Sequence, residues 1–583
     1  MEPLQFVQKA ICLALLVVLP TFCAPGQSEA GQSPKAPDIL HVTTHMVQVN
    51  VIVKDDHGHP VPGLSQSDFT IFDDGKPQEI SSFAVEQTRP PVSIPPVPPD
   101  IFTNIPDRQS GGSPAVTVIL FDGLNTRWED QARVRVQILK FLKQLQPADR
   151  VGLYTLDTRL VMLHDFTSDS ESLVKALNSY SGRSGNEVKD SEADNAENPP
   201  QWVDSVQDLQ GMSGALSSAA VSNGIAQWLA NAVAAEANYY MNQRVAMTVN
   251  ALVAIADHLQ GVPGRKNLVW VSSGFPLLEG MDQFEQTGDF SRGNTYGEEI
   301  KRAAEALNDV NLAIYPVDAR GLMVDPSFEV NSRPPSMAAY RRMQRLKLPQ
   351  HLADNFPTMD EIAKRTGGRA FYNTNDIQGA IRQVIDDSQL TYLLSYYPTN
   401  TVWNGQFHKI KVKVDRPGLH LQYRDGYAAV AEPPAASPSG EKRLESAVFS
   451  PLDATGVAFA VKTVPEKSAS SSRQLTVQYW INPRDVTLVP NGNKWAGRVT
   501  VVLEEFGPRG EALKGLSRNF DFDLDPAREK QFLEAGLRFT QMLEVAPGAE
   551  RVRVVVRDDP TENLGSVNIP LDRVLPQSQP ARK

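Results

Sequence analysis

The stretch Val116-Thr-Val-Ile-Leu-Phe-Asp-Gly-Leu-Asn-Thr126 decides how the rest of the sequence is interpreted. It opens with an almost wholly apolar run, which is typical of a strand buried on both faces. The run ends at Asp122 and a polar turn, and a helix is predicted next because Val134, Ile138 and Leu142 fall on one helical face. Ligands of open α/β sheets bind beyond the carboxyl ends of the strands, so we expect Asp122 to lie at a binding edge.

Strand and helix patterns continue to alternate after this stretch. Further buried strands are predicted over 267–272 and 312–317, with a helix over 239–259 before the first of them, and a strand over 390–397 is predicted to close the alternation. Such alternation predicts an α/β fold, with a doubly wound, mostly parallel sheet covered on both faces. We assign this domain to residues 115–428, with a long insertion at about 181–237.

Two β-rich regions are predicted to flank this domain. Alternating hydrophobicity, which begins with a predicted strand over 47–53 and is interrupted by Asp/Gly turns, indicates a small β module over 38–86. Alternating strands predict a β-sandwich over 441–576. A proline-rich linker over 87–114 and a second linker over 429–440 separate the three parts. In the small module, the turn residues His57 and His59 beside Asp55 and Asp56 suggest either a metal site or ordinary solvated turn residues.

The composition and the N-terminus indicate an exported protein. The 583-residue chain has a formal net charge of −11, which argues against nucleic acid or an anionic membrane as the main partner. An apolar run over 10–19 is too short to span a bilayer and predicts a signal peptide over 1–30, leaving no integral membrane segment after cleavage. Both cysteines, Cys12 and Cys23, lie in this leader. We expect a periplasmic, outer-membrane-associated or extracellular product.

The motifs around the first buried strand resemble those of von Willebrand factor type A domains. That family ends its first strand in Asp-x-Ser-x-Ser, where this chain has Asp122, Leu124 and Thr126. The segments 264–270 and 313–321, with others at 61–69 and 423–427, are similar to secreted type A-related proteins of acidobacteria. The resemblance implies a Mg²⁺ site at the strand ends, completed by an acidic residue of a protein partner.

Two family ligands are replaced in this chain, so the metal hypothesis has a metal-free alternative. Leu124 offers no oxygen, and two serines stand where the family has Thr-Asp-Gly. Mg²⁺ prefers oxygen ligands with one or two carboxylates, and the candidate ligands are Asp122, Asn125, Thr126, Ser272, Ser273 and Asp318. In the alternative, Thr126 caps the following helix and Asp122 accepts hydrogen bonds from nearby amides. The cofactor is therefore either Mg²⁺ or none.

The sequence favours binding over catalysis. It contains no nucleophile-elbow, zinc-protease or phosphate-loop motif, and the adjacent His164 and Asp165 are the sole support for an extracytoplasmic hydrolase. The prediction is a non-enzymatic binding or scaffold protein that recognises an unknown protein partner through the strand ends and the 181–237 insertion. A purely structural envelope component is the third hypothesis.

Overall fold

The structure is a computed structural model that describes most of the chain from residue 46 onward. The described residues are 46–87, 98, 100–105, 115–180, 243–274, 306–307, 310–322, 355–400, 402–429, 438–465 and 474–575. The predicted signal peptide over 1–30 and the predicted insertion over 181–237 lie outside these residues.

Most secondary structure in the described residues is strand, arranged in five sheets. Four of these sheets contain only antiparallel pairs. The fifth is mixed, because its order is β10-β9-β6-β7-β8 and β8 runs antiparallel to β7. The prediction of a doubly wound, mostly parallel α/β fold was therefore wrong: within the described residues the chain is mainly β, with several antiparallel sheets.

The physical reason is that hydrophobic periodicity identifies strands but not their partners. The strand β11 (Leu390–Tyr396) was expected to close the alternation of strands and helices. It instead pairs antiparallel with β1 (Val47–Lys54) on one side and β4 (Ile80–Gln87) on the other. Pairing between such distant segments leaves no local trace in the sequence.

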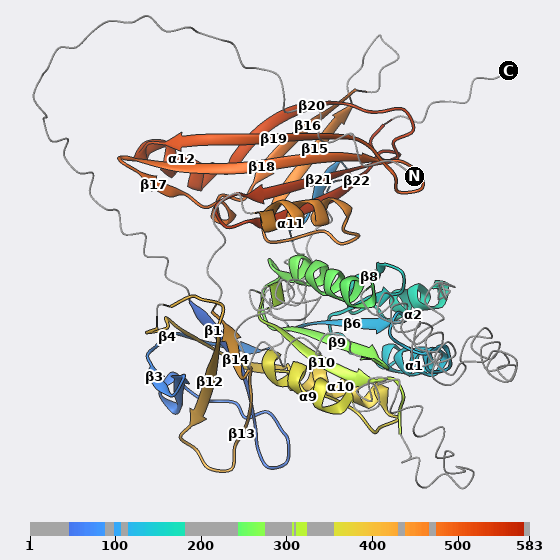
Figure 1. Cartoon of the computed structure of the whole chain (residues 1–583), viewed down its shortest axis with the longest axis vertical. Helices are drawn as coiled ribbons and strands as arrows, with labels where there is room; N and C mark the ends of the chain where they lie inside the picture. Colours follow the sequence, from blue (N-terminus) through green and yellow to red (C-terminus); the bar gives the residue numbers. More distant parts are fainter. Residues whose placement is uncertain are drawn as a thin grey trace, which may run out of the picture. The chain divides into compact units, whose positions relative to one another are not determined.

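The N-terminal sandwich, as we call it, is built from strands that precede the mixed sheet in the sequence and from strands that follow it. Its two sheets have the orders β13-β1-β11-β4 and β14-β12-β2-β3 (Figure 1). The remaining strands are β2 (Phe69–Asp73), β3 (Lys76–Gln78), β12 (Phe407–Val414), β13 (His420–Gln422) and β14 (Gly426–Ala428), with a short 3₁₀ helix at Gln66–Asp68. Val49, Ile71, Tyr392 and Val412 belong to one shared buried core.

The mixed sheet is buried on both faces. Its strands are β6 (Val116–Asp122), β7 (Val151–Leu156), β8 (Leu160–Thr167), β9 (Lys266–Ser272) and β10 (Leu312–Asp318). All seven residues of β6 are buried, as expected for an apolar run without alternation. Because β6, β9 and β10 are parallel, their carboxyl ends lie at one edge of the sheet.

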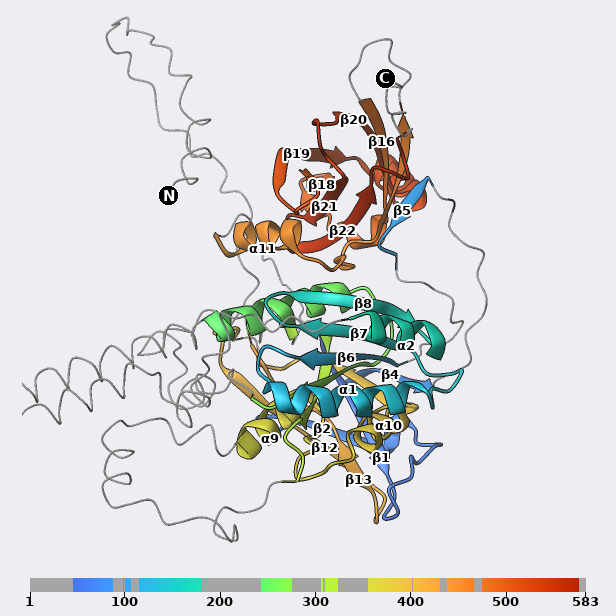
Figure 2. The ribbon, with the colours of Figure 1, turned by 90° about the vertical axis from the view of Figure 1, so that its right-hand side faces the viewer.

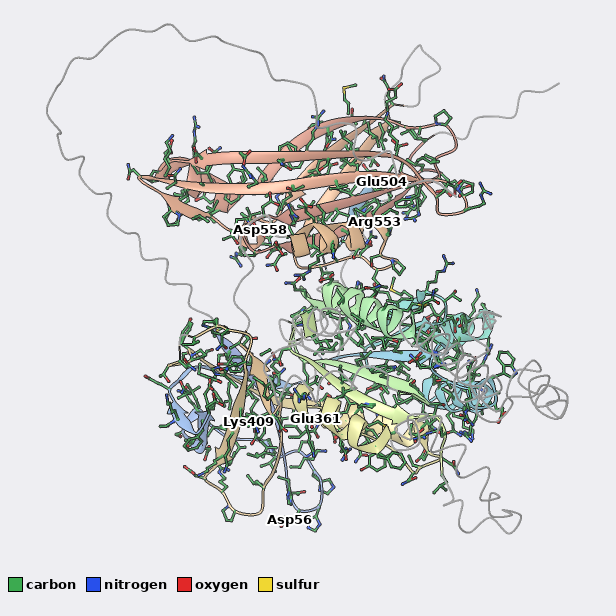
Figure 3. All side chains as sticks on the ribbon, in the orientation of Figure 1. Asp56, Glu361, Lys409, Glu504, Arg553 and Asp558 are labelled. Atoms are coloured by element: carbon green, nitrogen blue, oxygen red, sulfur yellow. The ribbon has the colours of Figure 1, made fainter. Side chains whose placement is uncertain are left out.

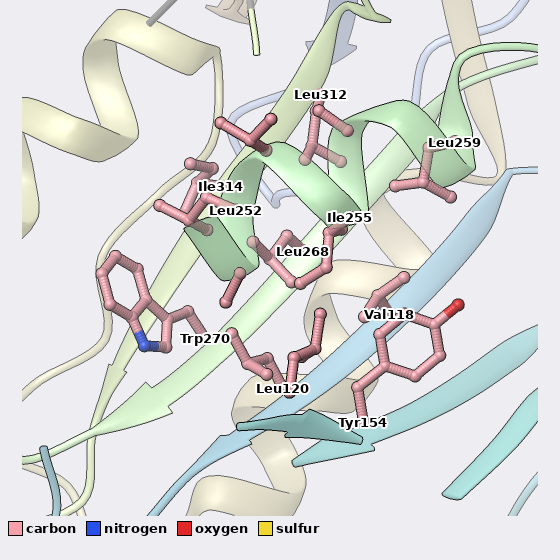
Figure 4. Close-up of a cluster of buried hydrophobic side chains, with 14 of the residues drawn as sticks. Val118, Leu120, Tyr154, Leu252, Ile255, Leu259, Leu268, Trp270, Leu312 and Ile314 are labelled. Carbon is pink, nitrogen blue, oxygen red and sulfur yellow. The ribbon is translucent and has the colours of Figure 1, made fainter. Parts of the chain in front are cut away.

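Helices supply the apolar partners of each face. The helix over 243–259 and α9 (Asn355–Thr366) pack on the face of Val118 and Leu120, where Leu252 and Ile255 enter the core (Figure 4). On the other face, the helices in contact are α1 (Trp128–Leu142), α2 (Ser170–Ser179) and α10 (Ile377–Asp387) (Figure 2). Full burial of one Leu or Ile side chain stabilises the fold by about 1.5–3 kcal/mol. The helices therefore stabilise the sheet and its carboxyl edge.

The C-terminal sandwich, our name for residues 438–465 and 474–575 together with β5, has two antiparallel sheets around one core. The first sheet has the order β20-β16-β15-β5 and the second β17-β18-β21-β22, with β19 also paired to β18. The elements are β15 (Phe459–Pro465), β16 (Gln474–Ile481), β17 (Val489–Asn491), β18 (Lys494–Phe506), β19 (Ala512–Leu524), β20 (Leu537–Glu544), β21 (Arg551–Asp558), β22 (Asn563–Pro570), α11 (Pro438–Phe449), α12 (Pro526–Ala535) and a 3₁₀ turn at Pro483–Asp485.

A strand from the stretch predicted as a linker also joins this sandwich. The strand β5 (Ile101–Thr103) pairs antiparallel with β15. Beside it, the buried Asn104 side chain donates to the carbonyls of Ala454 (2.6 Å) and Val457 (2.8 Å) and accepts from the amide of Phe459 (2.9 Å). These three hydrogen bonds use both N–H donors and the oxygen of the side-chain amide, and they fix this part of the chain to the sandwich.

Candidate functional site

The carboxylate of Asp122 lies fully buried at the carboxyl end of β6, surrounded by hydrogen-bond donors. Its Oδ2 accepts from Asn125 Nδ2 (2.9 Å), Trp270 Nε1 (2.8 Å) and Ser272 Oγ (3.0 Å). Its Oδ1 accepts from the backbone amide of Asn125 (3.0 Å). With Thr248 of the helix over 243–259, which accepts from Asn125 Nδ2 (3.1 Å), these residues form what we call the Asp122 cluster.

Burial and hydrogen bonding act in opposite directions on Asp122. Desolvation by burial raises the pKa of its carboxyl group, and the donors from Asn125, Trp270 and Ser272 lower it. The net pKa lies above the ordinary value. Burying this carboxylate is therefore costly, and its hydrogen-bond donors offset the cost. Removing one donor should destabilise the folded chain strongly.

One polar atom of the cluster is left without a partner. Asn125 Oδ1 is buried and has no hydrogen-bond partner among the described residues. The orientation of this amide is set by Asp122, because the carboxylate can accept only from the Nδ2 side. The Asp122 cluster thus keeps one free acceptor beside its closed network.

Thr126 and Ser273 lie beside the cluster and bond to each other. Thr126 Oγ1 accepts from the amide of Ser273 (3.3 Å), and Ser273 Oγ donates to Asp130 Oδ2 (3.0 Å). The helix α1 begins at Trp128 with Arg127 in the N-cap position, so Thr126 does not cap it. These contacts tie the end of β9 to the first turn of α1.

Asp318 lies buried at the end of β10 and is paired with Arg320. Its Oδ1 accepts from the backbone amide (2.9 Å) and Nε (3.0 Å) of Arg320, and its Oδ2 accepts from Nη2 (3.0 Å). This two-pronged ion pair neutralises the carboxylate. Asp318 therefore does not supply a free negative charge to the Asp122 cluster.

This arrangement does not fit a Mg²⁺ ion. A cation needs free lone pairs, whereas the Asp122 oxygens already receive four N–H or O–H donors. The indole of Trp270 can only donate, and it occupies Oδ2 together with Asn125 and Ser272. Because Asp318 is also paired with Arg320, neither carboxylate is free for an ion, so the donor set favours the metal-free alternative.

Trp270 is the member of the cluster that sequence reasoning missed. It belongs to an apolar run and was interpreted only as core. Strand register provides the signal that would have revealed it, because Trp270 pairs with Leu120, and Leu120 shares a strand face with Asp122. A buried indole needs an acceptor, and the nearest one across the strands is this carboxylate.

His164 and Asp165, the basis of the hydrolase hypothesis, do not form a side-chain pair among the described contacts. His164 Nδ1 lies 2.7 Å from the carbonyl oxygen of Asp165, not from its carboxylate. The Asp165 carboxylate accepts from the amide of Phe166 (2.7 Å) and lies 3.7 Å from His258 Nε2. The geometry offers no oriented acid–base couple at His164.

Two large apolar side chains are exposed at the same edge of the mixed sheet. Trp128, at the start of α1, is 65% exposed, and Leu322, four residues after β10, is 62% exposed. Their segments are adjacent, because Arg133 of α1 donates to the carbonyl of Ala319. We call the surface formed by Trp128, Asp130, Ser273, Arg320 and Leu322 the strand-end surface.

Comparisons with known proteins give only distant similarities. No family model and no curated protein sequence matches the chain. An aerotolerance-related membrane protein from Bacteroides fragilis is 13% identical, with a TM-score of 0.21, and the match covers 47% of this chain and 98% of that one. BatB from Bacteroides thetaiotaomicron is 14% identical over 47% of this chain and 98% of that chain, also with a TM-score of 0.21. The pilus adhesin SpaC from Lactobacillus rhamnosus GG is 9% identical, with a TM-score of 0.22, over 88% and 61% of the two chains.

Similarities at this level identify neither the fold nor the function of the chain, so the argument for function rests on the site itself. One further finding concerns membranes. Among the helices within the described ranges, none has the length and apolarity needed to cross a bilayer.

Proposed function

We propose that the chain is an exported, non-enzymatic binding protein of the cell envelope whose strand-end surface recognises a protein partner. The observation that carries the proposal is the exposure of Trp128 and Leu322 at one edge of a sheet whose faces are otherwise covered. Large aromatic and aliphatic side chains at a rim of polar groups are what protein interfaces use as anchors. Isolated exposed leucines are common, but here a tryptophan and a leucine are both exposed on two segments that the Arg133 hydrogen bond joins.

The support beneath this surface is rigid. The Asp122 cluster fixes the turn that leads into α1, and Arg133 ties α1 to the segment after β10. A surface that is already ordered loses little conformational entropy on binding. Binding partners of von Willebrand factor type A domains use the corresponding edge, and the resemblance over 116–126 supports the same location here.

The partner class follows from charge and chemistry. A net charge of −11 disfavours polyanions, so we propose a protein with an apolar pocket and a basic or neutral rim. A tryptophan that fills such a pocket is typically an interface hot spot.

Site-specific photocrosslinking tests this proposal. A photoreactive residue at position 128 or 322 should capture one partner from the envelope of the source cells. The same residue at Val136, which is 49% exposed on α1, is the matched control. With the purified partner, Trp128→Ala should weaken binding at least about tenfold and Val136→Ala should leave it unchanged.

Two results would contradict the proposal. One is equal crosslinking from positions 128, 322 and 136, which indicates random encounters. The other is unchanged affinity of the purified pair when Trp128 and Leu322 are both replaced by alanine.

A further inference from the structure

The N-terminal sandwich contains a cluster of metal-ligating groups far from the strand-end surface in sequence. Among the described residues, the one group of three or more His, Cys, Asp or Glu side chains able to share an ion is Asp73, Asp74 and His408. Asp73 ends β2, Asp74 follows in the turn to β3, and His408 lies on β12, beside Lys409, which Figure 3 labels. Asp73 and His408 are buried, and the Asp74 side chain is 46% exposed.

One oxygen of each carboxylate accepts hydrogen bonds from Tyr396 and Tyr427 or from the Lys409 amide, and the other oxygen lies close to the His408 ring. Asp73 Oδ2 accepts from the hydroxyls of Tyr396 (3.0 Å) and Tyr427 (2.9 Å). Asp74 Oδ1 accepts from the backbone amide of Lys409 (2.9 Å). The remaining oxygens, Asp73 Oδ1 and Asp74 Oδ2, both face His408 Nδ1, at 3.2 Å and 3.5 Å. Outer hydrogen bonds that orient ligand carboxylates in this way are the usual support of a metal site.

A single hydrogen bond, from His408 Nδ1 to Asp73 Oδ1 (3.2 Å), does not account for all the oxygens around the imidazole. His408 Nδ1 faces three oxygens, because the Tyr427 hydroxyl also lies 3.3 Å away. One N–H can serve one of them well, and all three separations lie at or beyond the long end of N–H···O hydrogen bonds.

The separations fit ligands around a small divalent ion. With metal–ligand bonds of about 2.0–2.1 Å, two ligands of a tetrahedral zinc lie about 3.3–3.4 Å apart. The Nδ1–Oδ1 and Nδ1–Oδ2 separations of 3.2 Å and 3.5 Å match this value. One imidazole and two carboxylates are ligands of Zn²⁺, and two negative charges balance the ion.

The framework that carries these ligands is stiff. Asp74 and Gly75 both have positive φ, 47° and 79°, in a two-residue turn that joins the paired residues Asp73 and Lys76. Asp–Gly is the preferred sequence of this hairpin turn. On the other side of the hairpin, β12 pairs with β2 from Asp73 to Phe69. The ligands therefore come from two hydrogen-bonded strands and a tight turn rather than from a long loop.

We propose that Asp73, Asp74 and His408 form a Zn²⁺ site, with the fourth position open toward solvent beside Asp74. The ion joins the β2–β3 hairpin to β12, so it stabilises the N-terminal sandwich. The open position is available to water or to a carboxylate of another protein.

Zinc titration of the full chain tests this site. The metal-stripped chain, with Cys12 and Cys23 alkylated, should bind one equivalent of Zn²⁺ in calorimetry and unfold at a higher temperature with the metal. Co²⁺ should bind at the same place and give the visible absorption of tetrahedral cobalt. Asp74→Asn keeps an acceptor for the Lys409 amide, so its metal-free form should be as stable as the wild type.

Zinc binding should be weakened only by substitutions of the proposed ligands. Asp74→Asn and His408→Gln should each weaken zinc binding at least about tenfold and abolish the rise in unfolding temperature. The matched control is His420→Gln, because His420 is an exposed histidine that lies 3.0 Å from a carboxylate oxygen of Asp56. It should bind zinc like the wild type, as should the double variant His57→Gln/His59→Gln.

Three outcomes overturn the proposal. They are no saturable zinc binding by the wild type, zinc binding that survives both Asp74→Asn and His408→Gln, and binding of Ca²⁺ in preference to Zn²⁺. The first result would leave the three side chains as a hydrogen-bonded group without an ion.

Discussion

Asp122 is a buried carboxylate whose oxygens are occupied by protein donors. Replacing it with alanine removes the acceptor of four hydrogen bonds, which come from the Trp270 indole, the Ser272 hydroxyl and the two Asn125 amide groups. Unpaired buried polar groups and a small cavity are both destabilising. We expect Asp122→Ala to lower the free energy of unfolding by about 3 kcal/mol in urea titrations.

The metal dependence of this loss separates the two hypotheses for the cluster. In the metal-free arrangement the loss is the same in EDTA and in Mg²⁺. If Mg²⁺ stabilises the wild-type chain but not Asp122→Ala, the metal-free arrangement is contradicted. Ser273→Ala is the control, because its hydroxyl bonds to Asp130 outside the network of Asp122.

The sequence allowed part of this site to be anticipated. The spacing of Asp122 and Asn125 places both in one turn, and the end of the next buried strand supplies Ser272. The role of Trp270 was missed, because without the strand register an indole in an apolar run has the same pattern as any core residue. The pairing of Asp318 with Arg320 was also hidden, because sequence does not show which neighbouring charges bond.

At the scale of elements, the helix over 243–259 carries a buried histidine between two acidic segments. His258 Nδ1 lies 2.6 Å from the carbonyl oxygen of Asp453, and Nε2 lies 3.7 Å from the Asp165 carboxylate of β8. Burial lowers the pKa of His258, but the acidic neighbours Asp165 and Asp453 raise it more, so the net pKa is above the ordinary value. The protonated form is therefore favoured in the folded chain.

This raised pKa predicts how stability varies with pH. A basic group whose pKa is higher in the folded state adds stability that is fully present below its unfolded pKa of about 6.5. The gain is lost as the pH rises through the folded pKa. The unfolding temperature of the wild type should exceed that of His258→Gln most below about pH 6.5, and the difference should shrink as the pH rises above this value. A difference that is constant with pH would show that the histidine acts through packing alone.

The strands and helices themselves were largely visible in the sequence, but their partners were not. Periodicity and turn residues predicted strands at 390–397 and 47–53, and the structure places β11 and β1 there. Their antiparallel pairing joins Val51 to Tyr392. Side-chain alternation fixes which face of a strand is buried and carries no information about which distant strand covers its edge.

At the scale of the whole molecule, the N-terminal sandwich depends on residues from both sides of the mixed sheet. The edges of β11 are covered by β1 and β4. A chain that starts at residue 88 lacks both strands and exposes the apolar side chains of Tyr392, Leu394 and Tyr396. We expect this truncated chain to bind a hydrophobic dye and to be cleaved by protease within 390–428.

The matched control is a chain that starts at residue 45, which keeps every strand of the N-terminal sandwich. It should resist cleavage in the same region. Resistance of both chains would show that β11 to β14 fold without β1 to β4, and would contradict the dependence inferred from the strand pairing.

The pairing of β1 with β11 also sets an order in time. A nascent chain emerges with its N-terminus first, so β1 is made long before its partner Leu390–Tyr396 exists. Until then, the apolar residues of β1 and β4 have no native neighbour on that side, which is the state most exposed to wrong association. Closing such a distant contact is slow, because the intervening chain must be brought together first. The first strand of the described residues is therefore among the last to reach its native pairing.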